Sequence, residues 1–212
     1  MAARPCAVIF GAGDSGSAAA AIAARLADEG LPLHLAGTHA AGLKAAATAL
    51  RPSGQAVTIA TLDPADATQV ASLFQRIADA GQQPSLVVHA PGAQSTGTPA
   101  LQTSLAEAEA LWRRICYAGA LIGQAAMPRL LEAGQGTLLL LAPAASGAAV
   151  AAASAGLRAL SQSMAREFGP QGLHVAQLML AEGVQPEAVA ETCWWLHRQH
   201  RTTWTQELDL LP

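Results

Sequence analysis

Few side chains in this sequence have the type and the spacing needed to move a proton. The chain has one tyrosine, Tyr117, and one lysine, Lys44. In a Tyr-x-x-x-Lys pair, the ammonium group lowers the phenol pKa from about 10 and allows proton transfer near neutral pH. Tyr117 and Lys44 lie too far apart in the sequence to form such a pair. Proton transfer would therefore have to use other groups.

The remaining candidate proton donors are scattered, and the sequence assigns a catalytic role to none of them. His89 ends an apolar run, and imidazole titrates closest to neutral pH, so it is the first histidine to test. Ser146 and Ser154 lie at the start of an alanine-rich stretch, where helix entry also explains Ser146. Tyr117 lies in another such stretch, where a core or interface position also accounts for it.

We predict no metal site. His197 and His200 are three residues apart on a predicted helix, but arginines flank them, which indicates a solvated basic face. The cysteines have no CxxC spacing and suit a reducing cytoplasm. They are Cys6, Cys116 and Cys193.

Composition excludes several classes of protein. The chain has 212 residues, of which 51% are hydrophobic and 13% charged, with a net charge of −3. Soluble domains usually carry roughly 25% charged residues, so another subunit or the chain's own helices should cover much of the surface. Without a basic stripe we expect no nucleic-acid or anionic-membrane partner. The uncharged stretch Gly136–Leu157 is interrupted by Pro143 and is not expected to span a membrane.

Apolar runs alternate with alanine-rich helical stretches along the whole chain. This pattern predicts an α/β fold with a Rossmann-like, doubly wound parallel sheet of about seven strands, three layers and one domain over residues 1–212. The predicted strands are Ala7–Phe10, Leu33–Ala36, Ala56–Ala60, Leu86–His89, Thr137–Leu141, His174–Leu180 and Glu207–Leu210. The predicted helices are Ala18–Glu29, Ala40–Leu50, Ala65–Ala80, Leu105–Leu131, Ala149–Phe168 and Pro186–His200. Asp63-Pro64 predicts an N-cap and a first-turn proline for the third helix.

Two loops at strand ends are candidate nucleotide contacts. Gly11–Ser17 follows the first strand and opens the first helix, where backbone N–H groups can hold a pyrophosphate; a plain strand-to-helix turn is the alternative. The residues of interest in this loop are Gly11, Gly13, Asp14, Ser15 and Gly16. Thr38, after the second strand, can bond a ribose or phosphate or else cap the next helix. NAD-binding proteins usually have an acidic residue at the end of the second strand, and an arginine there suits NADP. Thr38 is neither, so it does not indicate which of the two cofactors is preferred.

These motifs, in this order, resemble the short-chain dehydrogenase/reductase family over nearly the whole chain. Leu62-Asp63 matches the family position whose carboxylate contacts the adenine amino group, and Leu86–Gly92 matches its Asn-Asn-Ala-Gly strand end, with Ala90 and Gly92 kept. Leu157–Gly172, followed by His174, resembles the family's long helix and sixth strand. The resemblance implies NAD or NADP as cofactor and a homo-oligomer, or a hetero-oligomer with an active relative.

The family's catalytic residues do not carry over. Its serine position falls at or near Pro143, its Tyr-x-x-x-Lys positions at Val150 and Ser154, and its helix asparagine near Ile115 or Cys116. Loss of acid–base help alone lowers a rate by roughly 10²–10⁴.

The family's helical substrate lid is also missing from the sequence. Ala181–Gln185 leads directly into Pro186 and the last predicted helix, and places Glu182 near the expected nicotinamide or pyrophosphate.

We therefore expect a catalytically degenerate member that keeps an NAD(P) site and serves as a regulatory, structural or partner subunit. One alternative is an active NAD(P)-dependent oxidoreductase of a small carbonyl or alcohol, with a non-standard acid among His89, Ser146, Ser154 and Tyr117. A second alternative is an interaction module that binds no cofactor.

Overall fold

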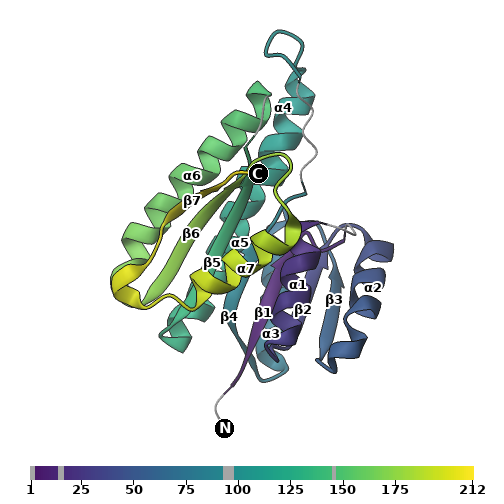
Figure 1. The fold of residues 1–212 in the computed structure, drawn as a ribbon, viewed down its shortest axis with the longest axis vertical. Coiled ribbons are helices and arrows are strands. Elements are labelled where there is room, and N and C mark those ends of the chain that lie inside the picture. Colours follow the sequence, from purple (N-terminus) through teal and green to yellow (C-terminus); the bar gives the residue numbers. More distant parts are fainter. Residues whose placement is uncertain (1–2, 14–16, 93–97, 145–146) are drawn as a thin grey trace.

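A single parallel sheet carries all seven described strands, in the order β3-β2-β1-β4-β5-β6-β7. The computed structural model describes residues 3–13, 17–92, 98–144 and 147–212, and Figure 1 shows helices on both faces of the sheet. The predicted fold class is confirmed. The strands are β1 (Arg4–Phe10), β2 (Leu33–Gly37), β3 (Val57–Thr61), β4 (Gln82–His89), β5 (Gly136–Pro143), β6 (Leu173–Leu180) and β7 (Glu207–Leu210).

The α-helices lie close to their predicted positions, with one interruption. They are α1 (Ala18–Asp28), α2 (Ala40–Ala49), α3 (Ala67–Asp79), α4 (Leu105–Trp112), α5 (Ala118–Ala133), α6 (Ala148–Phe168) and α7 (Pro186–His197). A π-helical segment, η2 (Arg113–Tyr117), joins α4 to α5, and short 3₁₀ segments are η1 (Arg51–Ser53), η3 (Gly169–Gln171) and η4 (Arg201–Thr203).

The central strands have apolar, buried cores because helices cover both faces of the sheet. In β1, Val8 and Phe10 face a core shared with α3, α4, α5 and α6, whereas Ala7 and Ile9 face a core shared with α1, α2 and α7. Alternate residues of one strand thus fill two separate cores. The sheet is held in the middle of a three-layer structure, with its carboxyl edge left to form a site.

The cap predicted for the third helix was wrong. Asp66, not Asp63, is the N-cap of α3, and its Oδ1 accepts from the N–H groups of Thr68 and Gln69 at 2.9 and 3.0 Å. These backbone hydrogen bonds, that of Gln69 first, lower the Asp66 carboxyl pKa. Asp63 closes a turn instead, because its Oδ1 accepts from the Ala65 N–H at 2.8 Å. The Asp63 carboxylate is thereby fixed at the sheet edge ahead of the helix.

The predicted helix Leu105–Leu131 is not α-helical throughout. In η2 the Ala118 N–H bonds to the Arg113 carbonyl, five residues back. Such single π turns occur frequently at functional sites. This one faces the carboxyl end of β4.

Candidate functional site

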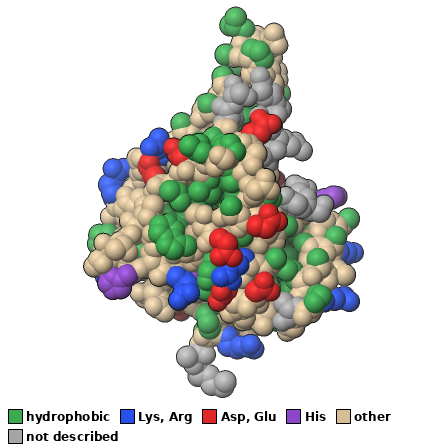
Figure 2. Space-filling view, viewed as in Figure 1, with side chains coloured by type: hydrophobic (Ala, Val, Ile, Leu, Met, Phe, Trp, Pro, Cys, Tyr) green, Lys and Arg blue, Asp and Glu red, His purple; other side chains and the backbone are tan. Residues whose placement is uncertain are grey.

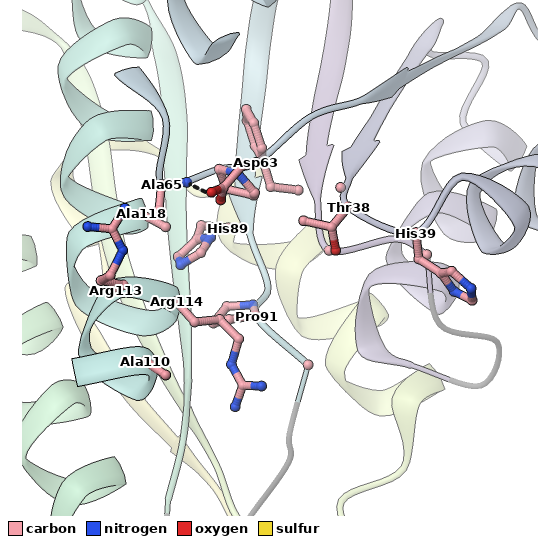
Figure 3. Close-up of a pocket in the computed structure, with 16 residues that line it drawn as sticks. Thr38, His39, Asp63, Ala65, His89, Pro91, Ala110, Arg113, Arg114 and Ala118 are labelled. Carbon is pink, nitrogen blue, oxygen red and sulfur yellow. Dashed lines mark hydrogen bonds between the residues drawn. The ribbon is translucent and has the colours of Figure 1, made fainter. Parts of the chain in front are cut away.

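A cavity of about 540 Å³ lies at the carboxyl edge of the sheet, where β2, β1 and β4 end (Figure 3). The order in which strands are added to the sheet reverses between β1 and β4, and this position is the usual ligand site of open α/β sheets. Thr38 and His39 stand on one side, Arg113 and Arg114 on the other, with His89 between them (Figure 3). The lining residues are Phe10, Gly11, Gly13, Gly37, Thr38, His39, Asp63, Pro64, Ala65, His89, Pro91, Gly92, Ala110, Arg113, Arg114 and Ala118.

Glycines form a tight backbone cradle on this cavity. Gly11 has φ +98°, and a Cβ there would lie 2.0 Å from the Ala90 carbonyl oxygen. A Cβ on Gly42, in the first turn of α2, would lie 1.6 Å from the Gly13 oxygen. Both positions therefore require glycine, because a side chain there would collide with the backbone of a neighbouring segment.

His89 lines this cavity, and its ring is held by a hydrogen bond to η2. Its Nε2 bonds to the Ile115 carbonyl oxygen at 3.0 Å, and because a carbonyl only accepts, we assign the ring proton to Nε2. Nδ1 is then an acceptor, and it is buried with no partner among the described residues. Burial lowers the His89 pKa to about 4, against the opposing effect of the Ile115 bond. The ring is therefore neutral at pH 7.

Two arginines of the π segment supply positive charge. Arg113 and Arg114 line the cavity, and the Arg113 guanidinium lies 5.4 Å from the centre of the Tyr117 ring. The sequence-based interpretation missed both residues. The sequence feature that could have indicated them is a pair of arginines in an otherwise apolar helix. That both line one cavity depends on the π turn, which the sequence does not reveal.

The structure brings together half of the predicted cofactor residues. Gly11, Gly13, Thr38, Asp63 and Gly92 line the cavity. Ala90 and Leu62 are buried beside it, 6% and 5% exposed, with Leu62 in the core. Asp14, Ser15 and Gly16 lie outside the described residues. The cofactor contacts themselves stay predictions.

Thr38 does not cap α2. The N-cap residue is His39, which makes no side-chain capping bond. Of the two roles left open for Thr38, a ligand contact is the one compatible with its place on the cavity.

The weak catalytic candidates do not meet in one place. Ser154 lines a second cavity of about 510 Å³ between α6, β6 and β7, and not the one that contains His89. Its hydroxyl donates to the Pro143 carbonyl at 3.0 Å, and Val150 is buried in the core. Tyr117 is 41% exposed and does not line either cavity. Ser146 lies outside the described residues.

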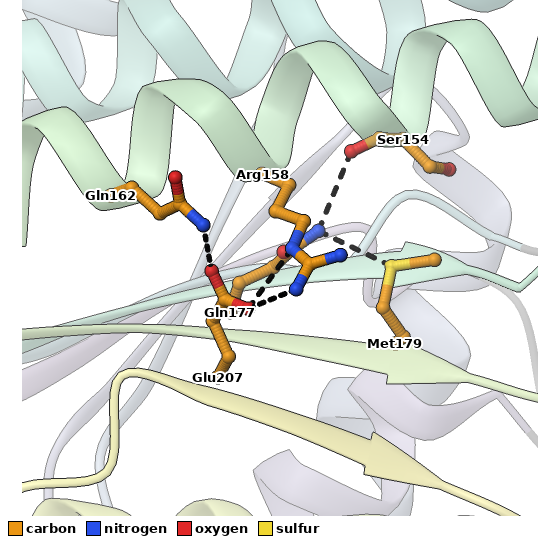
Figure 4. Close-up of polar contacts among 6 residues, drawn as sticks. All are labelled: Ser154, Arg158, Gln162, Gln177, Met179 and Glu207. Atoms are coloured by element: carbon orange, nitrogen blue, oxygen red, sulfur yellow. Dashed lines mark hydrogen bonds and ion pairs between the residues drawn. The ribbon is translucent and has the colours of Figure 1, made fainter.

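Polar contacts under α6 surround Ser154 (Figure 4). The buried Gln177 amide donates to the Ser154 carbonyl at 3.5 Å and to the Met179 sulfur at 3.3 Å. Arg158 Nε donates to Glu207 at 2.9 Å, and Gln162 donates to the same carboxylate. These contacts tie α6 to β6 and β7 and leave no proton relay at Ser154.

The lid region and the last helix are both resolved. α7 begins at Pro186, directly after a short turn, as predicted. Glu182 is exposed and does not line the cavity. His197 is not on a solvated face, which corrects the sequence-based interpretation, because its Nδ1 bonds to Thr137 Oγ1 at 2.9 Å. Burial lowers its pKa to about 4.

The described residues lack both a metal-binding cluster and a membrane-spanning helix. They hold no group of three or more His, Cys, Asp or Glu placed to bind a metal ion. Among their helices, none is both long and apolar enough to cross a bilayer.

Comparison with known proteins agrees with this geometry. The family profile described as enoyl-(acyl carrier protein) reductase matches residues 11–179. A short-chain dehydrogenase from Rhodopseudomonas palustris is 32% identical, with a TM-score of 0.88, over 99% of this chain and 98% of its own. No curated protein matches the chain.

Two more distant structures share the fold. A metagenomic short-chain oxidoreductase in complex with NADP is 22% identical, with a TM-score of 0.87, over 99% of both chains. An alcohol dehydrogenase from Thermococcus sibiricus complexed with 5-hydroxy-NADP is 19% identical, with a TM-score of 0.86, over 98% of this chain and 95% of its own.

The fold defines a Rossmann-like α/β protein class. Within that class, the chain belongs to the short-chain dehydrogenase/reductase family.

Proposed function

We propose that this protein binds NAD or NADP at the cavity beside His89 but has lost the family's carbonyl chemistry, and serves as a regulatory or partner subunit. The proposal rests on the contrast between two places in the molecule. Gly11, Gly13 and Asp63 line a cavity suited to a nucleotide. Val150 and Ser154 align with the family's proton-relay positions, but Val150 is buried in the core and the Ser154 hydroxyl already donates to the Pro143 carbonyl.

The residues of the cavity fit the nucleotide half of such a cofactor. Gly11, Gly13 and Asp63 line the cavity, and the Asp63 carboxylate can accept from an amino group. A bound nicotinamide supplies a hydride, and a ketone also requires a proton donor. The relatives with NADP or its 5-hydroxy derivative support nucleotide binding by this fold.

Binding and turnover can be tested separately. NADH and NADPH are titrated into the full chain while the fluorescence of its four tryptophans is followed. We expect saturable quenching, weakened about 10-fold by Asp63→Asn through loss of a charged hydrogen bond, and unchanged by Asp28→Asn on the exposed end of α1. If neither cofactor gives quenching or a calorimetric signal, the remaining interpretation is an interaction module that binds no cofactor.

A panel of aldehydes and ketones with each reduced cofactor then tests degeneracy. We expect no cofactor oxidation above the protein-free rate. Turnover that His89→Ala abolishes and Ser154→Ala does not would instead establish an active oxidoreductase with a displaced acid.

In the proposed role, a second copy or an active relative packs on α4 and α6. Trp112 and Leu105 are 45% and 90% exposed on α4, and exposed aromatic side chains favour interfaces.

A further inference from the structure

A third cavity, of about 270 Å³, lies between β2, β3 and α3. β3 is an edge strand of the sheet. α2 packs against one of its faces, whereas α3 packs chiefly on β4 and α5 and leaves part of the other face open. The side chains of Ala60 and Ala80 are small, and with Leu73 they form an apolar wall. Since ligand pockets usually measure roughly 300–1,000 Å³, this cavity suits a molecule of few atoms. It shares no described lining residue with the nucleotide cavity.

His34 offers this cavity a hydrogen-bond acceptor. Its Nε2 lies 2.6 Å from Gln82 Oε1, and because an amide oxygen only accepts, we assign the ring proton to Nε2. Nδ1 is then an acceptor, and it makes no hydrogen bond with the described residues. Unlike His89 Nδ1, it is not sealed from solvent. The ring is only 6% exposed and lines the cavity, so this is where a ligand hydroxyl can donate to it.

Arg76 gives the same cavity a positive charge. It lies on the exposed side of α3 and forms no side-chain hydrogen bond or ion pair with the described residues. Its charge acts on His34: burial lowers the pKa of that ring, the Gln82 bond raises it, and Arg76 lowers it. The ring is therefore neutral at pH 7 and keeps its acceptor. Because the chain as a whole carries −3, a cavity with an unpaired guanidinium group stands out as a place for an anion.

The polar groups of the cavity select two different groups on one ligand. A carboxylate fits the Arg76 guanidinium and the Gln82 amide, whose N–H groups make no hydrogen bond with the described residues. The same carboxylate does not fit Nδ1 of neutral His34, because both present lone pairs. A hydroxyl group does fit there. An ammonium group fits less well, since the nearby Arg76 repels it.

We propose that this cavity binds a small hydroxycarboxylate, with its carboxylate on Arg76 and Gln82 and its hydroxyl donating to His34 Nδ1. The site is separate from the nucleotide cavity, and it does not depend on the proposed function.

NMR spectroscopy of the histidine rings in the full chain tests this with lactate, propionate and alanine at neutral pH. Lactate has both groups, propionate lacks the hydroxyl, and alanine has an ammonium group in its place. We expect lactate to shift the His34 ring signals saturably, and the other two to bind about 10-fold more weakly. Arg76→Gln should weaken lactate binding about 10-fold. Arg51→Gln, at an exposed position outside the cavity, should leave it unchanged.

The comparison of ligands needs no variant of the buried His34, and Arg76 is exposed, so its replacement keeps the fold. Equal affinities for lactate and propionate would overturn the inference, as would lactate binding that Arg76→Gln does not weaken or that leaves the His34 signals unshifted. Asp63→Asn should not change the affinity for lactate, and Arg76→Gln should not change that for NADPH. The two proposals can therefore fail separately.

Discussion

At the scale of single residues, His89 shows how burial can turn a titratable group into a fixed acceptor. Its ring is 2% exposed and donates to the Ile115 carbonyl. A charged ring at this buried position lacks hydration and has no anion to compensate, so the neutral form dominates. The neutral ring is a poor acid at neutral pH.

The same burial predicts a pH dependence of stability. The folded His89 pKa is about 4, against 6.5 for the unfolded chain, so between these values the unfolded state binds more protons. The contribution of His89 to the free energy of unfolding is therefore present in full above pH 6.5. It decreases as the pH drops toward 4, by up to about 3 kcal/mol. Urea denaturation should show a shallower pH dependence for His89→Asn, which cannot titrate.

The matched control for that measurement is His200→Asn, because His200 is exposed. His197, with its pKa also lowered to about 4, contributes its own share in every variant. If the free energy of unfolding of His89→Asn falls as much as that of wild type between pH 6.5 and 4, the lowered pKa assigned to His89 is contradicted.

At the scale of elements, the position of α2 fixes the glycine loop. In Gly42→Ala, the new methyl group would meet the Gly13 oxygen, a backbone atom that cannot rotate away. We expect a loss of about 1–3 kcal/mol in stability from overpacking, together with weaker nucleotide binding as the loop shifts. Gly169→Ala is the control, since no heavy atom lies within 4 Å of its Cβ position. Thermal melts and NADPH titration of both variants decide the outcome.

Strands and most helices could be predicted because their signal is local. An apolar run such as Leu138–Leu141 must be buried, and the strand is fully buried on both faces. β4 was predicted four residues too short because Pro84 argues against a strand; the structure accommodates it at a register shift against Cys6. The Asp63 cap was wrong because Asp66 satisfies the same rule three residues later.

The site was less predictable because its main features depend on distant contacts. No local pattern near Arg113 shows that the helix makes a π turn there, or that His89 donates to the carbonyl of Ile115. His197 looked solvated because arginines lie near it in the sequence, yet Thr137 on β5, a strand that α7 contacts, bonds to its ring. Gly11 and Gly13 could be predicted because they lie between an apolar run and a helical stretch, whereas Gly42 was missed because its requirement comes from contact with Gly13.

At the scale of the whole molecule, the charged 13% of the sequence leaves apolar groups on the surface. Figure 2 shows apolar side chains gathered at the projecting end of the molecule, where Leu101 and Leu105 are almost fully exposed. On the neighbouring α6, Ala152 and Ala159 are exposed along one face. Trp112 packs beside Gly156 on that helix and is still 45% exposed. A second subunit would bury these groups.

We expect the purified chain to sediment as a dimer or tetramer at micromolar concentration. Ala152→Glu places a charge on the exposed face of α6, and an acidic side chain in the N-terminal part of a helix does not weaken the helix itself. This variant should therefore shift the assembly toward monomer without lowering the melting temperature of the monomer. Ala45→Glu, on the exposed face of α2, adds the same charge away from this surface and should leave sedimentation unchanged. A wild-type protein that stays monomeric throughout this range would refute assembly through α4 and α6, and the exposed apolar groups would then have to meet a different protein.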